Sequence, residues 1–298
     1  MHSSSISRTA ELAAYMRALA AREADSSIRC GDHLARHFLS SELFAMFIHE
    51  VFTDFIPSTD SSKTYRHAFP GLYYYHWART RHFDTLLLRA VEQGIDQLVV
   101  LGAGYDTRAY RLRPQLDNVR IFELDLPAIQ DKKTTILSKL FGSIPRHVIY
   151  IPLNFNDLTI KEALLAHGYE ATARTFFSWE GVTCYLNEAA VHTVFDFVAH
   201  HSATNSSLVF DYVAQSVLDR DLSSYGADVI VPALATAAEP LLFGIDPNAL
   251  ENILAAHQLR PVSDFGAREL EEHYLLSADG QVAGTIWECF RIAHAVVY

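Results

Sequence analysis

Short apolar runs that favour strands alternate with helical segments along the middle of this chain. The strand-like runs are QLVVLGAG, VRIFELD, HVIYIPLNF, ARTFFSWEG and SSLVFDYV, all within residues 97–213. Helical patterns separate them, with Pro127 placed to open one helix and Asn187 placed to cap another. This alternation predicts a parallel sheet that is covered by helices on both faces.

The alternation is interrupted once and then resumes. Residues 214–245 form a connection far longer than the usual few residues, which predicts a functional lid or a small subdomain. A helix (PNALENILAAHQL), a short strand (260–263), a second helix (ARELEEHYL) and a β-rich end (284–298) follow. The expected fold is α/β: a doubly wound, Rossmann-like, seven-stranded sheet, mostly parallel, with an antiparallel last strand.

The first 94 residues differ from the rest. Residues 8–50 and 76–93 have a helical apolar period, and the Pro-, Ser- and Gly-containing piece 55–71 between them predicts a loop. We therefore expect an N-terminal helical lid or cap at 1–94 and a sheet domain at 95–298 with an insertion at 214–245. Aromatic runs at 43–52 and 71–77 fit either core or the wall of an apolar pocket under that lid.

Composition excludes several classes of partner. A net charge of −11 over 298 residues argues against DNA or RNA. No apolar run is long enough for a membrane span, and the start lacks the apolar core of a signal peptide. Three scattered cysteines fit a reducing, cytoplasmic setting, and the 15 histidines show no metal-ligand spacing, so no metal is expected. A monomer or homodimer is equally compatible with these features.

The first strand-like run ends in LGAGYDTRAYRL, a glycine turn suited to a nucleotide or nucleoside. Gly102 and Gly104 allow a positive φ and close approach of a ligand. The turn is not a dinucleotide fingerprint, because Thr107 stands where the third glycine would fall. A dehydrogenase, or a nucleoside-binding module without catalysis, is thus a remote alternative.

Polar residues follow the next strand-like runs. Asp125, about twenty residues after the glycine turn, is placed to bind ribose hydroxyls, with Glu123 as second choice; a solvated strand end that caps the next helix is an equally good interpretation. Asn154 and Phe155 could hold an adenine, or form a plain turn. The fourth run ends in EGVTCYL, whose Glu180 and Tyr185 would face the crevice where open α/β sheets bind ligands.

Together GAGYDTRAYRL, FELDLP and EGVTCYL, with ARTRHFD at 78–84 and FGIDPNAL at 243–250, resemble the leucine carboxyl methyltransferase family of S-adenosylmethionine-dependent enzymes. The similarity spans roughly 70–298. It is strongest to the branch of small-molecule O-methyltransferases that includes the tetracenomycin polyketide O-methyltransferase.

The resemblance implies a cofactor, S-adenosyl-L-methionine, which becomes S-adenosyl-L-homocysteine, and a set of residues that hold it. Arg79, assisted by Arg81, would bind its α-carboxylate, and Glu180 with Gly181 would lie near its ammonium. The glycine turn would pass under its methionine part, with Asp106 close by. The remaining implied contacts are Asp125 and Leu126 at the ribose and Asn154 and Phe155 at the adenine. The full set of implied cofactor-binding residues is Arg79, Arg81, Gly102, Ala103, Gly104, Asp106, Asp125, Leu126, Asn154, Phe155, Glu180 and Gly181.

One position departs from the family pattern, since Asn154 stands where an Asp is common. The expected reaction is methylation of a carboxylate or phenol of a small, polyketide-like molecule. A carboxylate needs no general base, whereas a phenol needs one. The candidates for that base are histidines in the lid or in the 60–82 region, such as His67, His76 or His82. Tyr185, His76 and Tyr75 are the candidates for the substrate pocket, and the catalytic residue itself is not identified. The alternative within the same fold is methylation of a protein C-terminal carboxylate.

Overall fold

Seven strands form one sheet in the order β3-β2-β1-β4-β5-β7-β6. The computed structural model describes residues 8–53, 69–155, 160–234 and 240–298. The strands are β1 (Gln97–Leu101), β2 (Arg120–Asp125), β3 (Val148–Pro152), β4 (Thr175–Trp179), β5 (Ser207–Val213), β6 (Leu259–Phe265) and β7 (Phe290–Val297). Strands β1 to β5 pair in parallel, and β7 is antiparallel to both of its neighbours, β5 and β6. The predicted sheet and its antiparallel last strand are confirmed.

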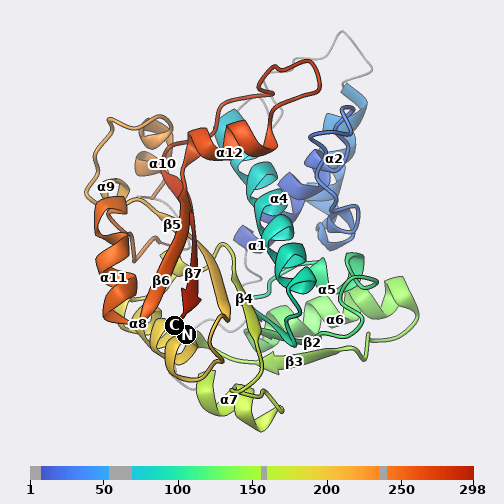
Figure 1. Cartoon of the computed structure of the whole chain (residues 1–298). Helices are drawn as coiled ribbons and strands as arrows, with labels where there is room; N and C mark the ends of the chain where they lie inside the picture. Colours follow the sequence, from blue (N-terminus) through green and yellow to red (C-terminus); the bar gives the residue numbers. More distant parts are fainter. Residues whose placement is uncertain (1–7, 54–68, 156–159, 235–239) are drawn as a thin grey trace.

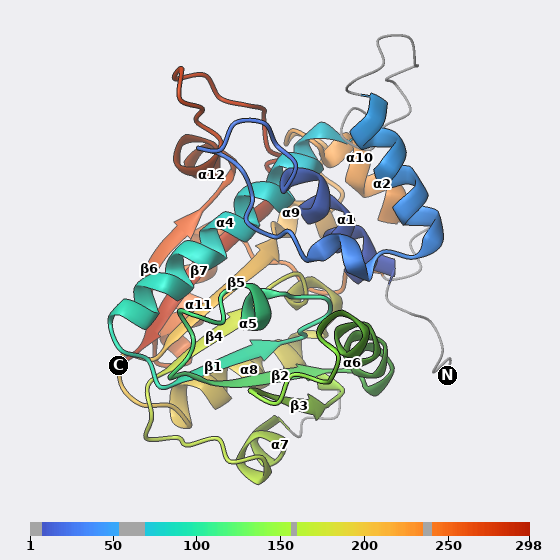
Figure 2. The same ribbon diagram turned by 90° about the vertical axis from the view of Figure 1, so that its right-hand side faces the viewer.

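Helices cover both faces of the sheet (Figures 1 and 2). Those after the first strand are α5 (Arg108–Arg111), α6 (Pro127–Phe141), α7 (Ile160–Ala166), α8 (Glu188–His200), α9 (Gln215–Leu218), α10 (Ala227–Leu234), α11 (Leu250–Ala256) and α12 (Ala267–Tyr274), with short 3-10 turns η4 (Thr183–Tyr185) and η5 (Pro247–Ala249). Alternate residues of β1 enter two cores: Leu98 and Val100 pack with α6 and α12, and Val99 and Leu101 pack with α7, α8 and α11. A strand buried on both faces explains its continuous apolar sequence.

Local signals in the sequence act where they were expected. Pro127 opens α6, and Asn187 caps α8 by accepting a hydrogen bond from the Ala190 N–H. Other expected boundaries shift. Strand β6 runs to Phe265, beyond the predicted 260–263, and the last strand begins only at Phe290, although the β-rich pattern starts at 284.

The N-terminal region contains α1 (Arg8–Ala20), the 3-10 turn η1 (Ala35–Phe38), α2 (Ser41–Thr53) and α4 (Pro70–Glu92). Residues 21–34 are not helical, because turn-forming Asp25 and Ser27 hydrogen-bond to each other there. Helix α4 starts at Pro70, six residues before the predicted 76. Most of the predicted loop 55–71, including His67, lies outside the described residues.

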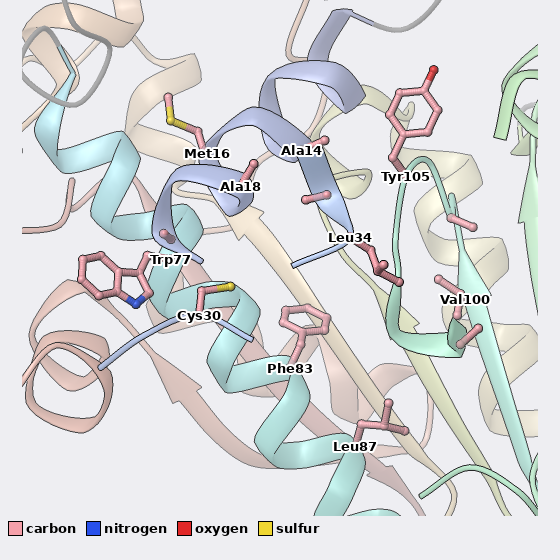
Figure 3. Packing of buried hydrophobic residues seen from close by; sticks show 14 of the residues in the cluster. Ala14, Met16, Ala18, Cys30, Leu34, Trp77, Phe83, Leu87, Val100 and Tyr105 are labelled. Atoms are coloured by element: carbon pink, nitrogen blue, oxygen red, sulfur yellow. The ribbon is translucent and has the colours of Figure 1, made fainter. Parts of the chain in front are cut away.

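The position of α1 matters most for the rest of the molecule. It packs beside α4, and its residues Ala14, Met16 and Ala18 enter the same core as Trp77, Phe83 and Leu87 of α4 (Figure 3). No helix in the described ranges has the length and apolarity needed to cross a membrane.

Candidate functional site

The carboxyl ends of β1, β2 and β4 lie at the same edge of the sheet, because β1 pairs in parallel with both of the other strands. The glycine turn after β1 therefore lies between Asp125 at the end of β2 and Glu180 just after β4. Three segments that are far apart in the sequence meet there. This is the crevice in which open α/β sheets bind ligands.

The glycine turn is shaped by contacts with its neighbours. Gly102 has a φ of +66°, and a Cβ at this position would lie 2.4 Å from Val182, so a side chain is excluded by the loop after β4. The Ala103 N–H donates to the Leu124 carbonyl, and the Gly104 N–H donates to Asp125 Oδ2 at 2.5 Å. The turn is thereby fixed to the end of β2.

Asp125, at the end of β2, lies at this edge and is partly accessible to a ligand. Its Oδ1 accepts from the Leu126 N–H at 2.6 Å. Burial raises the pKa of Asp125, and the backbone donors oppose that effect. Glu123, the second choice for ribose binding, is 1% exposed and forms an ion pair with Lys133 at 2.7 Å below the sheet edge. The structure therefore favours Asp125 over Glu123.

Glu180 lies between two arginines. Its Oε1 is 3.0 Å from Arg79 Nε, and its Oε2 is 2.7 Å from Arg108 Nη1. Burial raises the pKa of Glu180, but Arg108 and Arg79 outweigh burial and hold that pKa below its ordinary value. The same holds for Asp106. Burial raises the pKa of Asp106, but Arg108, 2.5 Å away, outweighs burial and lowers that pKa below its ordinary value. Both carboxylates are thus weak bases.

Asp211 of β5 is a site residue that the motifs did not identify. Its Oδ2 accepts from Arg79 Nη1 at 2.5 Å and from the Tyr75 hydroxyl at 2.9 Å, and its Oδ1 accepts from the Gly181 N–H at 2.6 Å. It is 5% exposed. The available signal was a single acidic residue inside the otherwise apolar run SLVFDYV, where an unpaired charge would be costly.

Gly181 completes this arrangement. It has a φ of +72°, and a Cβ there would lie 3.3 Å from Arg79 Nη1. A glycine therefore allows the loop after β4 to pass close to the guanidinium. Arg79, Glu180, Gly181 and Asp211 form one unit, which we call the Arg79 cluster.

Two pocket candidates on α4, Tyr75 and His76, contact this cluster. Tyr75 is 1% exposed, stacks on Phe290 with ring centroids 4.6 Å apart, and has its hydroxyl bonded to Asp211. The structure places Tyr75 in the scaffold of the cluster, not on an open pocket wall. His76 contacts Arg79 through Nδ1 at 2.9 Å and is 9% exposed.

Arg81 lies away from the cluster, contrary to its expected role beside Arg79. Its Nη1 donates to the Tyr274 carbonyl and its Nη2 to the Ser27 carbonyl. The reason is helical geometry, because residues two apart point to different sides of a helix. His82, a candidate base, bonds through Nδ1 to the Tyr274 hydroxyl and stacks on Phe265.

The cluster continues into a buried series of alternating charges toward α1. Asp84 accepts from Arg108 at 2.7 Å and from Arg111 at 2.5 Å. Arg111 also approaches Asp32, which accepts from Arg17 of α1 at 2.8 Å. These charges link the N-terminal region to the sheet.

Helix α1 lies against the glycine turn itself. Arg17 Nη2 donates to the Tyr105 carbonyl at 2.7 Å, and Glu11 forms an ion pair with Lys132 of α6. Figure 3 shows α1 beside the loop that carries Tyr105. A Cβ on Gly104 would meet Ala10 of α1 at 3.6 Å, an ordinary contact distance.

The other predicted residues lie around the same edge. Leu126 is 46% exposed just after Asp125, and Asn154 and Phe155 follow β3 with Phe155 packed on the second core. Tyr185 is half-buried in η4. The insertion 214–245 reaches this place too, since the Leu242 N–H donates to the Cys184 carbonyl at 2.7 Å. Within the described residues no group of three or more His, Cys, Asp or Glu side chains could hold a metal ion.

Comparison with known proteins adds the following similarities. The profile of the family described as leucine carboxyl methyltransferase matches residues 10–199. YktD of Bacillus subtilis, named as an S-adenosyl-L-methionine-dependent methyltransferase, is 30% identical over 220 residues, which are 74% of this chain and 71% of that protein. A protein of Mycolicibacterium gilvum with the same type of name is 34% identical over 52% of this chain and 53% of its own length. A DUF574 family protein from Streptomyces avermitilis has the same fold, with a TM-score of 0.58 and 12% identity over 96% of this chain and 97% of that one.

Proposed function

Because this chain belongs to the leucine carboxyl methyltransferase family of S-adenosylmethionine-dependent methyltransferases, we propose that it methylates a carboxylate oxygen of a small organic, polyketide-like molecule. The observation that carries the choice of acceptor is the state of the acids at the site. Asp106, Glu180 and Asp211 all have cationic partners, and the pKa values of Asp106 and Glu180 are lowered. An acceptor that is already ionised suits a site whose carboxylates are weak bases.

The described residues suit the cofactor. Arg79 is a buried cation whose Nη atoms each make one hydrogen bond within the described part of the chain, to Asp211 and to His76, so each keeps a further N–H for the α-carboxylate. Glu180 supplies negative charge for the α-ammonium. Asp125 has the position and the lone pairs for ribose hydroxyls, and the exposed side chain of Leu126 offers an apolar surface beside it for the adenosine.

S-adenosylmethionine, when bound, supplies a methyl group on a positively charged sulfur. The work of the protein is then alignment, since the acceptor oxygen must lie in line behind the methyl carbon at about 3 Å. The Arg79 cluster would fix the methionine end, and the backbone of residues 102–106 would set its depth in the crevice. Tyr185 and the insertion 214–245 border the side from which the acceptor would enter.

The test is a product assay with cofactor labelled in the methyl group. The purified chain is incubated with a panel of aromatic and aliphatic carboxylic acids and with the matching phenols. Methyl esters release labelled methanol in mild base, whereas methyl ethers do not. We expect base-labile product from acids.

Each other result of that assay contradicts the proposal in a defined way. Base-stable label on phenols would assign an ether-forming enzyme. Base-labile label that appears only with peptides ending in a free carboxylate would assign the protein substrate considered above. A chain that binds S-adenosylhomocysteine but methylates none of these acids would contradict the proposed acceptor and leave the family assignment intact.

A further inference from the structure

Among the residues that the structure describes, His76 is the histidine that contacts the Arg79 cluster. It lies three residues before Arg79 on α4, and that spacing places both side chains on the same side of the helix. Its Nδ1 is 2.9 Å from Arg79 Nη2. The Arg79 guanidinium in turn contacts Glu180 and Asp211, so a single hydrogen bond links the imidazole to the guanidinium at the centre of the cluster.

This contact fixes the tautomer of the imidazole. A guanidinium has only N–H donors and no acceptor atom. Arg79 must therefore donate, and His76 Nδ1 must accept with its lone pair. In the neutral ring the proton is then on Nε2.

The surroundings also keep the ring neutral. Burial, then the charge of Arg79, then that of Arg17, lower the pKa of His76 well below its ordinary value. The neighbouring Tyr75 presents its ring at 5.9 Å and its hydroxyl is already bonded to Asp211. A neutral His76 has one lone pair on its ring nitrogens, and Arg79 occupies it.

The free edge of the ring is a hydrogen-bond donor. His76 is 9% exposed, and among the described residues no polar atom is paired with its Nε2. A neutral donor beside the place proposed for the methionine end would suit an anionic oxygen. It does not suit a hydroxyl that must lose a proton, because the ring has no lone pair left to accept one.

We propose that His76 Nε2–H binds the acceptor carboxylate and orients it for methylation, and that His76 is not a general base; this inference rests on the proposed function. One carboxylate oxygen would accept from Nε2–H while the other forms a bond to the methyl carbon. The carbon–sulfur bond breaks with its electron pair remaining on sulfur. The products are a neutral ester and a neutral thioether, so no proton has to be taken up.

The tautomer can be measured without any acceptor. In protein labelled with ¹⁵N-histidine and saturated with S-adenosylhomocysteine, the His76 signals are identified by their loss in His76→Gln. We expect a bare Nδ1 and a protonated Nε2 between pH 6 and 8. A protonated Nδ1, or an imidazolium ring at pH 7, would overturn the inference.

Two variants separate the two nitrogens in a working assay with an aromatic acid such as benzoate or the best acid of the panel. His76→Asn keeps an oxygen acceptor near the Nδ1 position but has no donor near Nε2, whereas His76→Gln places an amide N–H near Nε2. We expect His76→Asn to raise the acceptor KM about 10- to 100-fold, the effect of one hydrogen bond to a charged group. His76→Gln should recover most of that loss.

Controls distinguish this failure from failure of the proposed function. The affinity for S-adenosylhomocysteine, measured by calorimetry, should change less than threefold in His76→Asn, because the contact with Arg79 is kept. If acids are methylated but His76→Asn and wild type have the same KM, the inference fails and the function stands. A different result would identify His76 as a base. In that case His76→Asn and His76→Gln would lose kcat equally, and the wild-type rate would fall tenfold for each pH unit on the acid side. The inference would then be wrong.

Discussion

At the scale of single residues, Asp211 explains why the site holds together. One carboxylate accepts bonds from an arginine, a tyrosine hydroxyl and a backbone N–H that come from α4 and from the loop after β4. The molecule contains a similar set that is separate from the site: Asp264 accepts from Arg291 at 2.8 Å and from Tyr212 at 2.9 Å. The second set offers a matched comparison.

Replacing Asp211 by Asn should weaken both the fold and the site. Removing one charge of a buried ion pair leaves Arg79 with less compensation, and we expect the free energy of unfolding to fall by about 3 kcal/mol. The affinity for S-adenosylmethionine should fall by roughly tenfold, since Arg79 and Gly181 lose their common anchor. Urea titration and calorimetry measure the two effects.

Asp264→Asn is the control for that experiment. It removes a carboxylate with the same kinds of partner and should lower stability without changing cofactor affinity. Equal losses of affinity in both variants would mean that the effect of Asp211 is only a general loss of stability.

About half of the candidate site could be predicted from the sequence. The glycine turn, Asp125 and Glu180 follow strand ends, where topology makes the assignment, and the structure brings them together. Asp211 pairs with Arg79 across 132 positions of the chain, and no local pattern specifies such a partner. The misplaced Arg81 could have been avoided, because a spacing of two residues on a helix separates side chains in direction.

At the scale of elements, α1 and the insertion 214–245 join α4 in reaching the site from outside the sheet. Arg17 and Glu11 attach α1 to the glycine turn and to α6, and Leu242 attaches the insertion to the loop after β4. We propose that both segments cover the active site. The strands were easier to predict than these two segments. Buried strands have a recognisable apolar composition, whereas a segment that covers a site is defined by its tertiary contacts, which the local sequence does not show.

Hydrogen exchange tests the cover. S-adenosylhomocysteine should slow amide exchange in 8–20 and in 215–234, because ligand contacts would reduce local opening. Helix α7, which packs in the second core behind the sheet, should exchange at the same rate with and without ligand. If exchange in the two covering segments is also unchanged, they are not a cover.

At the scale of the whole molecule, buried neutral histidines make the fold sensitive to acid. His82 is 2% exposed, and its Nε2 is buried with no hydrogen-bond partner among the described residues. Burial, with smaller effects of His294 and His273, lowers the pKa of His82 from 6.5 to about 3. The pKa of His294 is lowered to about 4, first by burial and then by Arg260. Both rings can take a proton near pH 6 only when the chain unfolds.

The sign of the pH dependence follows. A group with a lowered folded pKa adds stability above its unfolded pKa, and that stability is lost as the pH falls from 6.5 toward the folded value. His82 alone should cost about 2 kcal/mol between pH 6.5 and 5, at about 1.4 kcal/mol per pH unit. The raised pKa of Glu123, caused by burial, opposes this trend at the acid end.

Urea unfolding of His82→Phe at several pH values measures this contribution. The variant should lose about 2 kcal/mol less than wild type over that interval, because phenylalanine cannot titrate and can still stack on Phe265. Tyr274→Phe removes the hydrogen bond to His82 but not the titrating ring, so it should keep the wild-type slope. Identical slopes in His82→Phe and wild type would contradict the assignment.

The place of β7 has a consequence for how the protein is made. Synthesis proceeds from the N-terminus, so β5 and β6 leave the ribosome before residues 290–297, the strand that joins them in the sheet. Until then the edge of β5 that will receive β7 is open, and open apolar edges pair with other chains. The nascent chain can assemble β1 to β5 early, but it must wait for its last strand before the sheet is closed.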